Sequence, residues 1–369
     1  MGFWRASVET LVVVDPLFWR GKRVLLTGHT GFKGGWMMIW LRHLGAEVIG
    51  ISLPPAGEAH LFGHALVDAG IESHFCDIRD ADRLSTVVRD AQPEIVIHLA
   101  AQALVRASYC DPVGTFASNV MGSANLLESL RGLDHVRVAV MVTTDKVYHN
   151  FERSTPYCEE DRLGGHDPYS ASKAASELVI ASYRDAFLRN QGVAIASARA
   201  GNAIGGGDWS VDRLIPDALR AWRTDQVLQV RHPDAIRPWQ HVLEPLHGYL
   251  RLAETLWHQP DLCGSYNFGP HNHVTATVRD VVERARLAYG RGDVHYASEN
   301  EGPPEVKLLT LETAKARTVL GVSPKWELSE TVMRTVAWHR HFEDGECPRV
   351  LCLAEINDYQ MGLMDIAKS

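Results

Sequence analysis

A glycine-rich loop near the start of the sequence constrains the fold more than any other feature. Residues 27–34 read Thr-Gly-His-Thr-Gly-Phe-Lys-Gly, with a glycine at every third position. A short apolar run, Arg23–Leu26, precedes the loop, and a helical pattern, Gly34–Leu44, follows it. A strand, a glycine turn and a helix in this order open the βαβ unit of a Rossmann fold, which binds dinucleotides.

Each glycine of this loop has its own expected role. Gly28 allows the tight turn, Gly31 lets the backbone approach a pyrophosphate, and Gly34 permits close packing of the helix on the strand. The free N–H groups and the positive end of the helix dipole then face the phosphates. A purely structural turn is the alternative, which the flanking strand and helix disfavour. The expected cofactor contacts in the loop are Gly28, Thr30, Gly31, Phe32, Lys33 and Gly34.

The first 200 residues alternate short apolar runs with helical patterns. Parallel strands need crossover connections, so this alternation predicts a doubly wound parallel sheet with ligands at the carboxyl ends of its strands. The expected strands are Arg23–Leu26, Glu47–Ser52, Ile71–Phe75, Ile95–Leu99, Val136–Val142 and Val193–Arg199, and the longest expected helices are Pro112–Leu130 and Pro168–Arg189.

The pattern changes after residue 200, where we expect a smaller mixed α/β lobe that closes over the first. Its expected helices are Asp212–Trp222, His241–Trp257, Val278–Ala288 and Ser329–His341, with a short strand at Val227–Val230 and Ser329 as a helix cap. The predicted division is an extension at 1–19, a dinucleotide-binding domain at 20–200 to which 240–264 returns, and a substrate-binding lobe at 201–239 and 265–369.

The composition disfavours several classes of function. The formal charge of −8 argues against a broad nucleic-acid-binding surface. No apolar run is long enough to span a bilayer, and the first residues do not form a secretory signal. The six cysteines are scattered, without a CxxC pair or a histidine cluster of zinc-ligand spacing. We therefore expect reduced thiols, a cytoplasmic protein and no metal site.

The choice between NAD and NADP is less clear from the sequence. The second strand of this fold usually ends with an acid that holds the adenosine ribose, but residues 50–55 contain neither an acid nor an arginine. NAD is therefore favoured only weakly. Asp77 is placed to reach the adenine amine, or else to cap a helix that begins near Asp80. The expected cofactor contacts outside the loop are Ser52, Asp77, Ile78, Leu99, Ala100, Ala101, Gln102, Thr143, Tyr169 and Lys173.

A Tyr-x-x-x-Lys pattern begins the second long helix. Its spacing puts Tyr169 and Lys173 on one helix face. A nearby ammonium lowers the pKa of a phenol from its usual value of about 10. Hydride transfer from an alcohol needs a base on the O–H group, which this pair supplies, and the lysine can also hold the nicotinamide ribose. Two exposed helix residues are the alternative, which the upstream glycine loop disfavours.

Polar residues follow the fifth expected strand. Residues 143–146 read Thr-Thr-Asp-Lys, at the strand end where this fold places its chemistry. A threonine hydroxyl here can hydrogen-bond a substrate oxygen beside Tyr169, and Asp145 and Lys146 form an adjacent acid and amine. A surface turn with a salt bridge is the alternative interpretation.

These motifs together resemble the extended short-chain dehydrogenase/reductase family. The segments GHTGFKGGW, HLAAQALVRASY, TTDKVYHN, DPYSASKAASEL, ARAGNAIGGGDW, DRLIPD and AIRPWQHVLEPLHGYL resemble the CDP-glucose 4,6-dehydratases in particular, and the resemblance runs from about Phe18 to about Tyr359. It implies an NAD-dependent hydro-lyase that converts CDP-D-glucose to CDP-4-keto-6-deoxy-D-glucose in dideoxysugar and lipopolysaccharide biosynthesis. It also implies a homodimer formed through the two long helices.

The resemblance implies a role for each residue at the strand end. Tyr169 accepts the O4 proton as a hydride leaves C4, Thr144 orients O4, and Asp145 protonates the departing C6 hydroxyl. Related dehydratases of other nucleotide sugars carry a glutamate, the C5 base, where this chain has Lys146. We hypothesise that Lys146 is the C5 base or orients a water molecule that is.

The candidates for binding the substrate lie after residue 200. Arginine grips phosphate oxygens bidentately, so Arg213 and Arg237, together with Asn202, are expected to hold the nucleotide diphosphate. Trp239 is expected either to pack on the base or ribose or to lie in the apolar core.

Other functions remain open from the sequence. A nucleotide-sugar 4-epimerase needs no C6 acid, so the Asp145–Lys146 pair argues against it. A dehydratase for another nucleotide is the nearest alternative. A non-catalytic NAD-sensing protein would lack Tyr169 or Lys173, and this chain has both.

Overall fold

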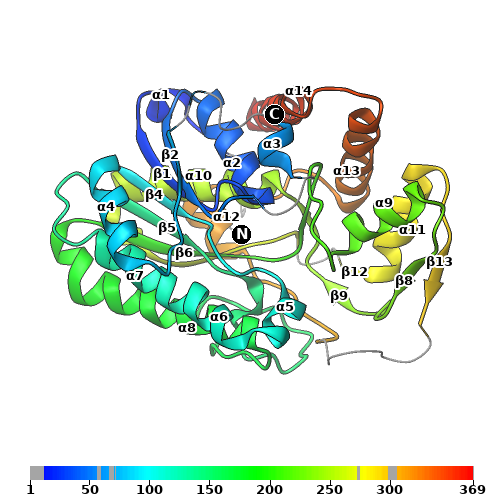
Figure 1. Cartoon of the computed structure of the whole chain (residues 1–369), viewed down its shortest axis with the longest axis horizontal. Coiled ribbons are helices and arrows are strands. Elements are labelled where there is room, and N and C mark those ends of the chain that lie inside the picture. Colours follow the sequence, from blue (N-terminus) through cyan, green and yellow to red (C-terminus); the bar gives the residue numbers. More distant parts are fainter. Residues whose placement is uncertain are drawn as a thin grey trace, which may run out of the picture.

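A seven-stranded parallel sheet forms the centre of the larger lobe in a computed structural model of the chain (Figure 1). The structure describes residues 12–55, 60–65, 70, 72–271, 275–297 and 306–368. The strand order is β11-β6-β5-β4-β1-β2-β3, and all neighbours pair in parallel. The strands are β1 (Arg23–Thr27), β2 (Glu47–Ser52), β3 (Glu72–Phe75), β4 (Ile95–His98), β5 (Val138–Val142), β6 (Ala194–Ala200) and β11 (Gly264–Phe268). The predicted doubly wound fold is confirmed, and its order reverses between β1 and β4, where such folds bind ligands.

The expected strands are all present, with end points shifted by at most two residues except at Ile71, which lies outside the described residues. The sequence did not predict β11, because Gly-Ser-Tyr-Asn-Phe contains no run of apolar residues. It pairs with β6 from Gly264 to Phe268. The sheet therefore continues beyond residue 264, into the range we had expected to belong to the smaller lobe.

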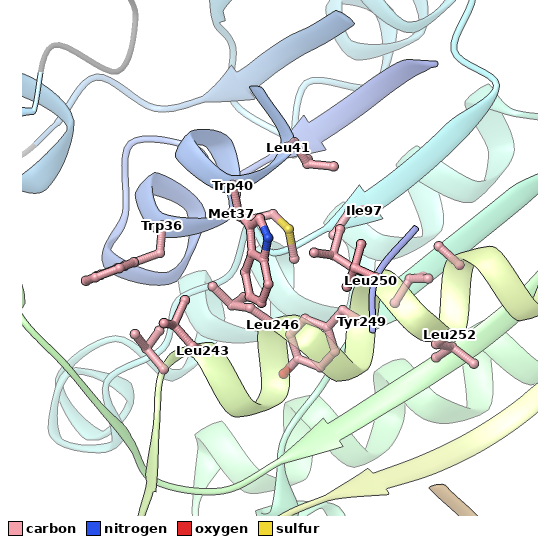
Figure 2. Close-up of a cluster of buried hydrophobic side chains, with 14 of the residues drawn as sticks. Trp36, Met37, Trp40, Leu41, Ile97, Leu243, Leu246, Tyr249, Leu250 and Leu252 are labelled. Carbon is pink, nitrogen blue, oxygen red and sulfur yellow. The ribbon is translucent and has the colours of Figure 1, made fainter. Parts of the chain in front are cut away.

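One face of the sheet is covered by helices whose contacts are mainly apolar (Figure 1). Alternate strand residues such as Val24 and Leu26 point to this face, because successive side chains of a strand point to opposite sides. Figure 2 shows Met37 and Trp40 of one helix facing Leu246 and Tyr249 of another. The helices are α1 (Pro16–Trp19), α2 (Phe32–His43), α3 (Leu61–His64), α10 (Leu243–His258), α12 (Ala314–Leu320) and α14 (Pro348–Lys368).

The opposite face carries α4 (Ala81–Ala91), α5 (Val105–Cys110), α6 (Pro112–Phe116), α7 (Gly122–Ser129) and α8 (Pro168–Tyr183). The two long helices expected here are not regular. A π-helical turn at Ala117–Met121 separates α6 from α7, and another at Arg184–Leu188 extends α8. In the first turn, the Asn119 side chain donates to the Gln102 carbonyl and the Ser172 hydroxyl. Sequence periodicity does not reveal such a local widening.

The smaller lobe lies beside the carboxyl edge of the sheet (Figure 1). It contains α9 (Leu214–Arg223), α11 (Val278–Tyr289) and α13 (Leu328–Glu343), with the strand pairs β8 (Leu228–Val230) with β13 (Val294–Tyr296) and β9 (Ile236–Arg237) with β12 (Ala276–Thr277). The strands β7 (Ala203–Ile204) and β10 (Gln240–His241) pair with each other, and each lies where the chain passes from one lobe to the other. The expected cap is wrong: Glu327 precedes α13, and the Ser329 hydroxyl accepts a hydrogen bond from Arg284 instead.

The chain segments at the two sequence extremes pack on the larger lobe where they are described. The Trp19 indole donates to Glu254 of α10 at 2.7 Å, and α14 packs on α2. Residues 1–11 of the expected extension lie outside the described residues. The division into domains stays a prediction, to which the structure adds that β11 belongs to the sheet, that α12 packs on β11, and that α14 packs on α2 and also contacts α13.

Candidate active site

The glycine loop is shaped so that a phosphate group can approach its middle. Gly28 has φ +77°, and a Cβ there would lie 2.7 Å from the Ala100 nitrogen. A Cβ on Gly34 would overlap the Gly28 carbonyl. At Gly31, by contrast, a Cβ would meet only that carbonyl, at 3.4 Å, and the residue precedes α2 without any side-chain cap. The protein's own packing therefore requires glycine at the first and third positions, whereas the open second position fits a pyrophosphate.

Hydrogen bonds hold the loops together at the ends of β1 and β4, where the strand order of the sheet reverses. The Thr27 hydroxyl accepts from the backbone N–H groups of Leu99 and Ala100, both at 3.1 Å. The Thr30 hydroxyl is 2.7 Å from that of Ser52. These contacts bring the expected cofactor residues at the ends of β1, β2 and β4 together at one edge of the sheet.

Two of the expected cofactor residues are engaged in other contacts. Asp77 forms an ion pair with Arg79 at 2.6 Å, and hydrogen bonding to Arg79 lowers the pKa of Asp77. The alternative role for Asp77 is wrong, because Asp80 is the residue that caps α4. The amide of Gln102 donates to Thr115, so this side chain anchors the loop after β4.

A buried ion pair, which the sequence analysis did not identify, lies beside the end of β5. Glu177 of α8 and Arg199 of β6 are each 3% exposed, with 2.9 Å between their charged atoms. The hydroxyl of Thr143 donates to Glu177 at 2.5 Å. Because one carboxylate joins α8, β5 and β6, it fixes the catalytic helix relative to the strand end. Its position four residues after Lys173 was the available signal, since it places a charge on the buried helix face.

Asp145 is buried directly at the end of β5. Its side chain is 1% exposed, and its Oδ1 accepts from the Thr144 hydroxyl at 2.9 Å. Burial raises the pKa of Asp145, against the opposing effects of Lys146, the Thr144 hydrogen bond and Arg237. A carboxyl group in this setting favours the protonated form, which is what a general acid requires.

Tyr169 lies at the start of α8, close to the same strand end. Burial raises the pKa of Tyr169 to about 12, while hydrogen bonding with Thr144 and the charge of Arg213 oppose the shift. Lys173 was expected to lower this pKa, but in the chain alone the pKa is raised, because burial outweighs the Thr144 hydrogen bond and the charge of Arg213. A cationic ligand beside Tyr169 would shift the balance back towards the phenolate.

The ammonium of Lys173 is held at the end of the same strand. It donates to the Val142 carbonyl at 3.0 Å, and burial lowers the pKa of Lys173 to about 8. The YxxxK pair therefore lies inside the protein, and the alternative of two exposed helix residues is wrong: Tyr169 is 8% exposed and Lys173 is 4% exposed.

Several cationic side chains converge on this place. The charges of Lys33 and Arg237 act on Asp145, and those of Arg213 and Lys173 act on Lys33. Burial lowers the pKa of Lys33 to about 8. Lysines and arginines from the glycine loop, α8 and the smaller lobe thus meet at one edge of the sheet, an arrangement that favours a ligand with several negative charges.

The remaining substrate candidates, Asn202, Arg213 and Trp239, lie in different surroundings. Gly201, next to Asn202, packs so tightly on Asp145 that a Cβ would lie 2.8 Å from Oδ2. Arg213 forms a long ion pair with the buried Asp208 at 3.8 Å. Trp239 is 7% exposed and belongs to the apolar core of the smaller lobe, as the second of its two expected roles required. Across the described residues, no group of three or more acidic, histidine or cysteine side chains could hold a metal ion.

The chain is similar in sequence to known enzymes that act on nucleotide sugars. A CDP-glucose 4,6-dehydratase of Salmonella typhimurium (strain LT2) is 42% identical to the chain over 94% of its residues and 98% of that protein. A UDP-glucose 4-epimerase of Mycolicibacterium smegmatis is 27% identical over 86% of this chain and 99% of its own length. The resemblance to CDP-glucose 4,6-dehydratases is therefore confirmed.

Solved structures share the fold at lower identity. A dTDP-glucose 4,6-dehydratase from Bacillus anthracis, in complex with NAD, has a TM-score of 0.75 at 20% identity and covers 89% of this chain and 100% of its own. A UDP-glucose 4-epimerase from Stenotrophomonas maltophila, with NAD bound, has a TM-score of 0.76 at 21% identity, with coverages of 88% and 100%. Residues 25–335 match the family model described as GDP-mannose 4,6 dehydratase, so this chain belongs to that family.

Proposed function

We propose that the chain catalyses the NAD-dependent dehydration of CDP-D-glucose to CDP-4-keto-6-deoxy-D-glucose. The observation that carries this proposal is the buried Asp145, whose pKa is raised, beside Tyr169 at the end of β5. Removing a hydroxyl from C6 needs an acid at this place, whereas a 4-epimerase needs none. The relative at 42% identity supports the cytidine nucleotide.

The first half of the reaction oxidises the sugar at C4. Tyr169 accepts the O4 proton, and the Thr144 hydroxyl, which shares a hydrogen bond with Tyr169, orients O4. When bound, NAD would supply the hydride acceptor for C4 and the hydride for C6. The ribose hydroxyls of that cofactor fit Lys173, and its pyrophosphate fits the N-terminus of α2 at Gly31.

The second half removes water across C5 and C6. The new C4 ketone makes the C5 proton acidic, and we propose that Lys146, half-buried next to Asp145, takes it directly or through a water molecule. Asp145 gives its proton to the C6 hydroxyl as the C6–O bond breaks and the C5–C6 double bond forms. Water leaves. A proton from the same base then returns to C5 as C6 takes up the hydride, so no net oxidation results and the enzyme is a hydro-lyase.

The diphosphate of the substrate fits the cationic side of the site. The charges of Arg237 and Arg213 act on Asp145 and Tyr169, respectively, and Asn202 follows Gly201, which packs on Asp145. Arginine holds phosphate oxygens in a bidentate fork, which places the sugar at a fixed distance from the acid.

The test is a substrate panel of CDP-, dTDP-, GDP- and UDP-glucose, with absorbance in alkali reporting the 4-keto product. We expect turnover with CDP-glucose and little with the others. Turnover of another nucleotide would correct the specificity alone. A C4 epimer without any 4-keto product would instead favour a 4-epimerase, and no reaction with any of them would contradict the proposal.

The role of Lys146 has a separate test. In deuterated water the Lys146→Ala variant should lose incorporation of deuterium at C5, while formation of NADH on adding substrate remains. Unchanged incorporation at C5 would assign the base elsewhere.

We also propose that the protein is a cytoplasmic homodimer. The family resemblance implies a dimer contact through the helical segments that contain α6 and α8. Apolar side chains are exposed on α6, on α8 and on the π turn between α6 and α7: Val113, Phe116, Met121 and Leu178. All six cysteines are free, as in a reducing compartment. In the described part of the chain, no helix combines the length and the apolar character needed to cross a membrane. The family resemblance supports a place in dideoxysugar and lipopolysaccharide biosynthesis.

A further inference from the structure

Tyr249 of α10 is buried in an apolar cluster, yet it carries a hydroxyl. The side chain has 0% exposure, and its ring packs edge-on against Phe268 with centroids 5.5 Å apart. Its hydroxyl has no hydrogen-bond partner among the described residues. A phenylalanine would fill the same space without burying an unsatisfied polar group, so the hydroxyl calls for an explanation.

The phenol of Tyr249 is directed towards the catalytic edge of the sheet. The helix α10 packs on β5 and β6, and it leads into β11, which runs parallel to β6. Its N-terminal end therefore lies at the carboxyl edge of the sheet. Side chains on a helix lean towards its N-terminus, and Figure 2 shows the Tyr249 hydroxyl on the side of Leu243, where α10 begins.

A second buried atom without a partner lies at that edge. Oδ2 of Asp145 has no hydrogen-bond partner within the described part of the chain, although Oδ1 is bonded to Thr144. Phe268, on which the Tyr249 ring packs, pairs in register with Ala200, and the following Gly201 packs on Oδ2 of Asp145. Burial raises the pKa of Tyr249, and the charges of Tyr169 and Asp145 raise it further, in keeping with this placement. Tyr169 belongs to α8 on one face of the sheet, and Tyr249 belongs to α10 on the other.

We propose that Tyr249 is a positioning residue for Asp145, and that its hydroxyl donates to Oδ2 through one buried water molecule. The two atoms are not bonded directly, and a single water satisfies both. With Oδ2 held by the water and Oδ1 by the Thr144 hydroxyl, the carboxyl group keeps one orientation towards the sugar. This inference rests on the proposed function, because the role of Asp145 as the C6 acid comes from it.

Other groups act on the same carboxyl, and they remain in place when the Tyr249 hydroxyl is removed. Lys146, Arg237 and Lys33 lower the pKa of Asp145 through their charges, and Thr144 lowers it through a hydrogen bond. Loss of one further donor should raise that pKa and weaken the acid. C4 oxidation does not use Asp145, so only the elimination step should slow.

The test compares Tyr249→Phe with the wild-type protein in the presence of CDP-glucose. We expect kcat to fall about tenfold with KM within about twofold, since orientation is only part of what a general acid contributes. NADH absorbance should accumulate during turnover, because C4 is oxidised at the normal rate. The control is Tyr266→Phe, which removes a hydroxyl that donates to the Leu262 carbonyl, and it should behave like wild type. Equal slowing of C4 oxidation and elimination, or an unchanged kcat, would overturn the proposal.

Two further measurements separate this link from the proposed function. In an Asp145→Asn background, adding Tyr249→Phe should slow elimination no further, whereas independent effects would multiply. In the protein without substrate, Tyr249→Phe should shift the infrared carboxyl band that Asp145→Asn removes. An unshifted band would contradict the link between the two residues even if no nucleotide sugar proved to be a substrate, and a shifted band would support it in the same case.

Discussion

The helices α2 and α8 cover opposite faces of one sheet, and the residues that they bury differ in kind. The buried side of α2 after its glycines is wholly apolar and includes Trp36 and Trp40. The buried side of α8 includes Tyr169, Lys173 and Glu177, with serines between them. Alternate strand residues supply each face with an apolar floor, so the sheet itself does not cause the difference.

The polar side of α8 is stable because its groups are paired. The Ser176 hydroxyl donates to the Asn119 carbonyl, Lys173 to the Val142 carbonyl, and Glu177 bonds Arg199. Buried polar groups are tolerated when hydrogen bonds replace those they made to water. We call the side of the sheet covered by α2 and α10 the α2 face, and the side covered by α7 and α8 the α8 face. We expect the α2 face to supply most of the stability of the fold, while the α8 face holds the catalytic groups in place.

The outer sides of the two helices differ as well. The helix α14 packs on α2 and buries Tyr359 against Trp40. The outer side of α8 keeps Leu178 exposed, and α6, which packs on α8, keeps Phe116 exposed. If the comparison holds, substitutions on the α2 face should change stability, those inside α8 should change turnover, and those outside α8 should change association.

Tyr169→Phe should have the largest effect. We expect turnover to fall roughly 10⁴-fold, or ~5.5 kcal/mol in activation free energy, because the base on O4 is lost. The melting temperature should stay within about 2 °C, since only a hydroxyl is removed. Formation of the 4-keto product and thermal unfolding are the two measurements. A large loss of stability with normal turnover would reverse the roles of the two faces.

Trp40→Ala should have the opposite signature. This side chain is fully buried and stacks on His247 with ring centroids 6.4 Å apart. Removing it should lower the free energy of unfolding by about 4 kcal/mol, while kcat of the folded protein changes little. Urea unfolding and turnover at low temperature measure the two quantities. Trp257→Ala, at a partly buried position against the same core, is the matched control and should destabilise less.

Glu244 of α10, the helix that covers the same side of the sheet as α2, should make the free energy of unfolding depend on pH. Burial raises the pKa of Glu244 to about 7 from 4.5, so the folded chain holds a proton that the unfolded chain releases. The contribution is fully present below pH 4.5 and is lost as pH rises to about 7, by up to about 3 kcal/mol. The stability of Glu244→Gln relative to wild type should therefore increase between pH 5 and 8.

The comparison with the variant is needed because other groups oppose this trend. Burial lowers the pKa of His241 and His247 to about 3, so their contribution is present above pH 6.5 and is lost as pH falls. Both proteins contain these histidines, so their effect cancels in the difference. A difference that stays constant with pH would show that Glu244 is ionised in the folded state.

Leu178→Asp should have the smallest effect on the isolated chain. The residue is 65% exposed on α8, so stability of the monomer should change by less than about 0.5 kcal/mol. Sedimentation should nevertheless shift from dimer to monomer, because a charge is placed in the proposed contact. Leu287→Asp, which alters a 73% exposed leucine on α11 in the other lobe, should leave the sedimentation unchanged. A dimer that survives Leu178→Asp would move the contact elsewhere.

Much of the fold follows from local patterns in the sequence. The bounds of β2 agree with the prediction residue for residue, because Glu47–Ser52 is an apolar strand with clear turns on both sides. The helix α14 was missed because its apolar residues do not keep a clear helical period, since it packs against several elements. The sequence analysis did not predict the π turn around Asn119. The Asn119 side chain bonds Ser172, which is far along the chain, and local periodicity does not show such a contact.

The site was less predictable than the fold. Tyr169, Lys173 and Asp145 were found because they occupy fixed places relative to strand ends and helix turns. The burial that raises the pKa of Tyr169 depends on the packing of three elements, and a sequence does not show it. The ion pair between Arg199 and Glu177 joins a strand to a helix, and the sequence around neither residue indicates which partner it has.

The packing of α14 on α2 also has a consequence for how the chain folds during its synthesis. Trp40 contacts Tyr359, so the cover of an early helix is made more than 300 residues after it. Chains usually fold from the N-terminal part as they emerge from the ribosome. Here the α2 face would stay partly open to solvent until Leu363 has been added, and a chaperone that shields apolar surface would find its target there.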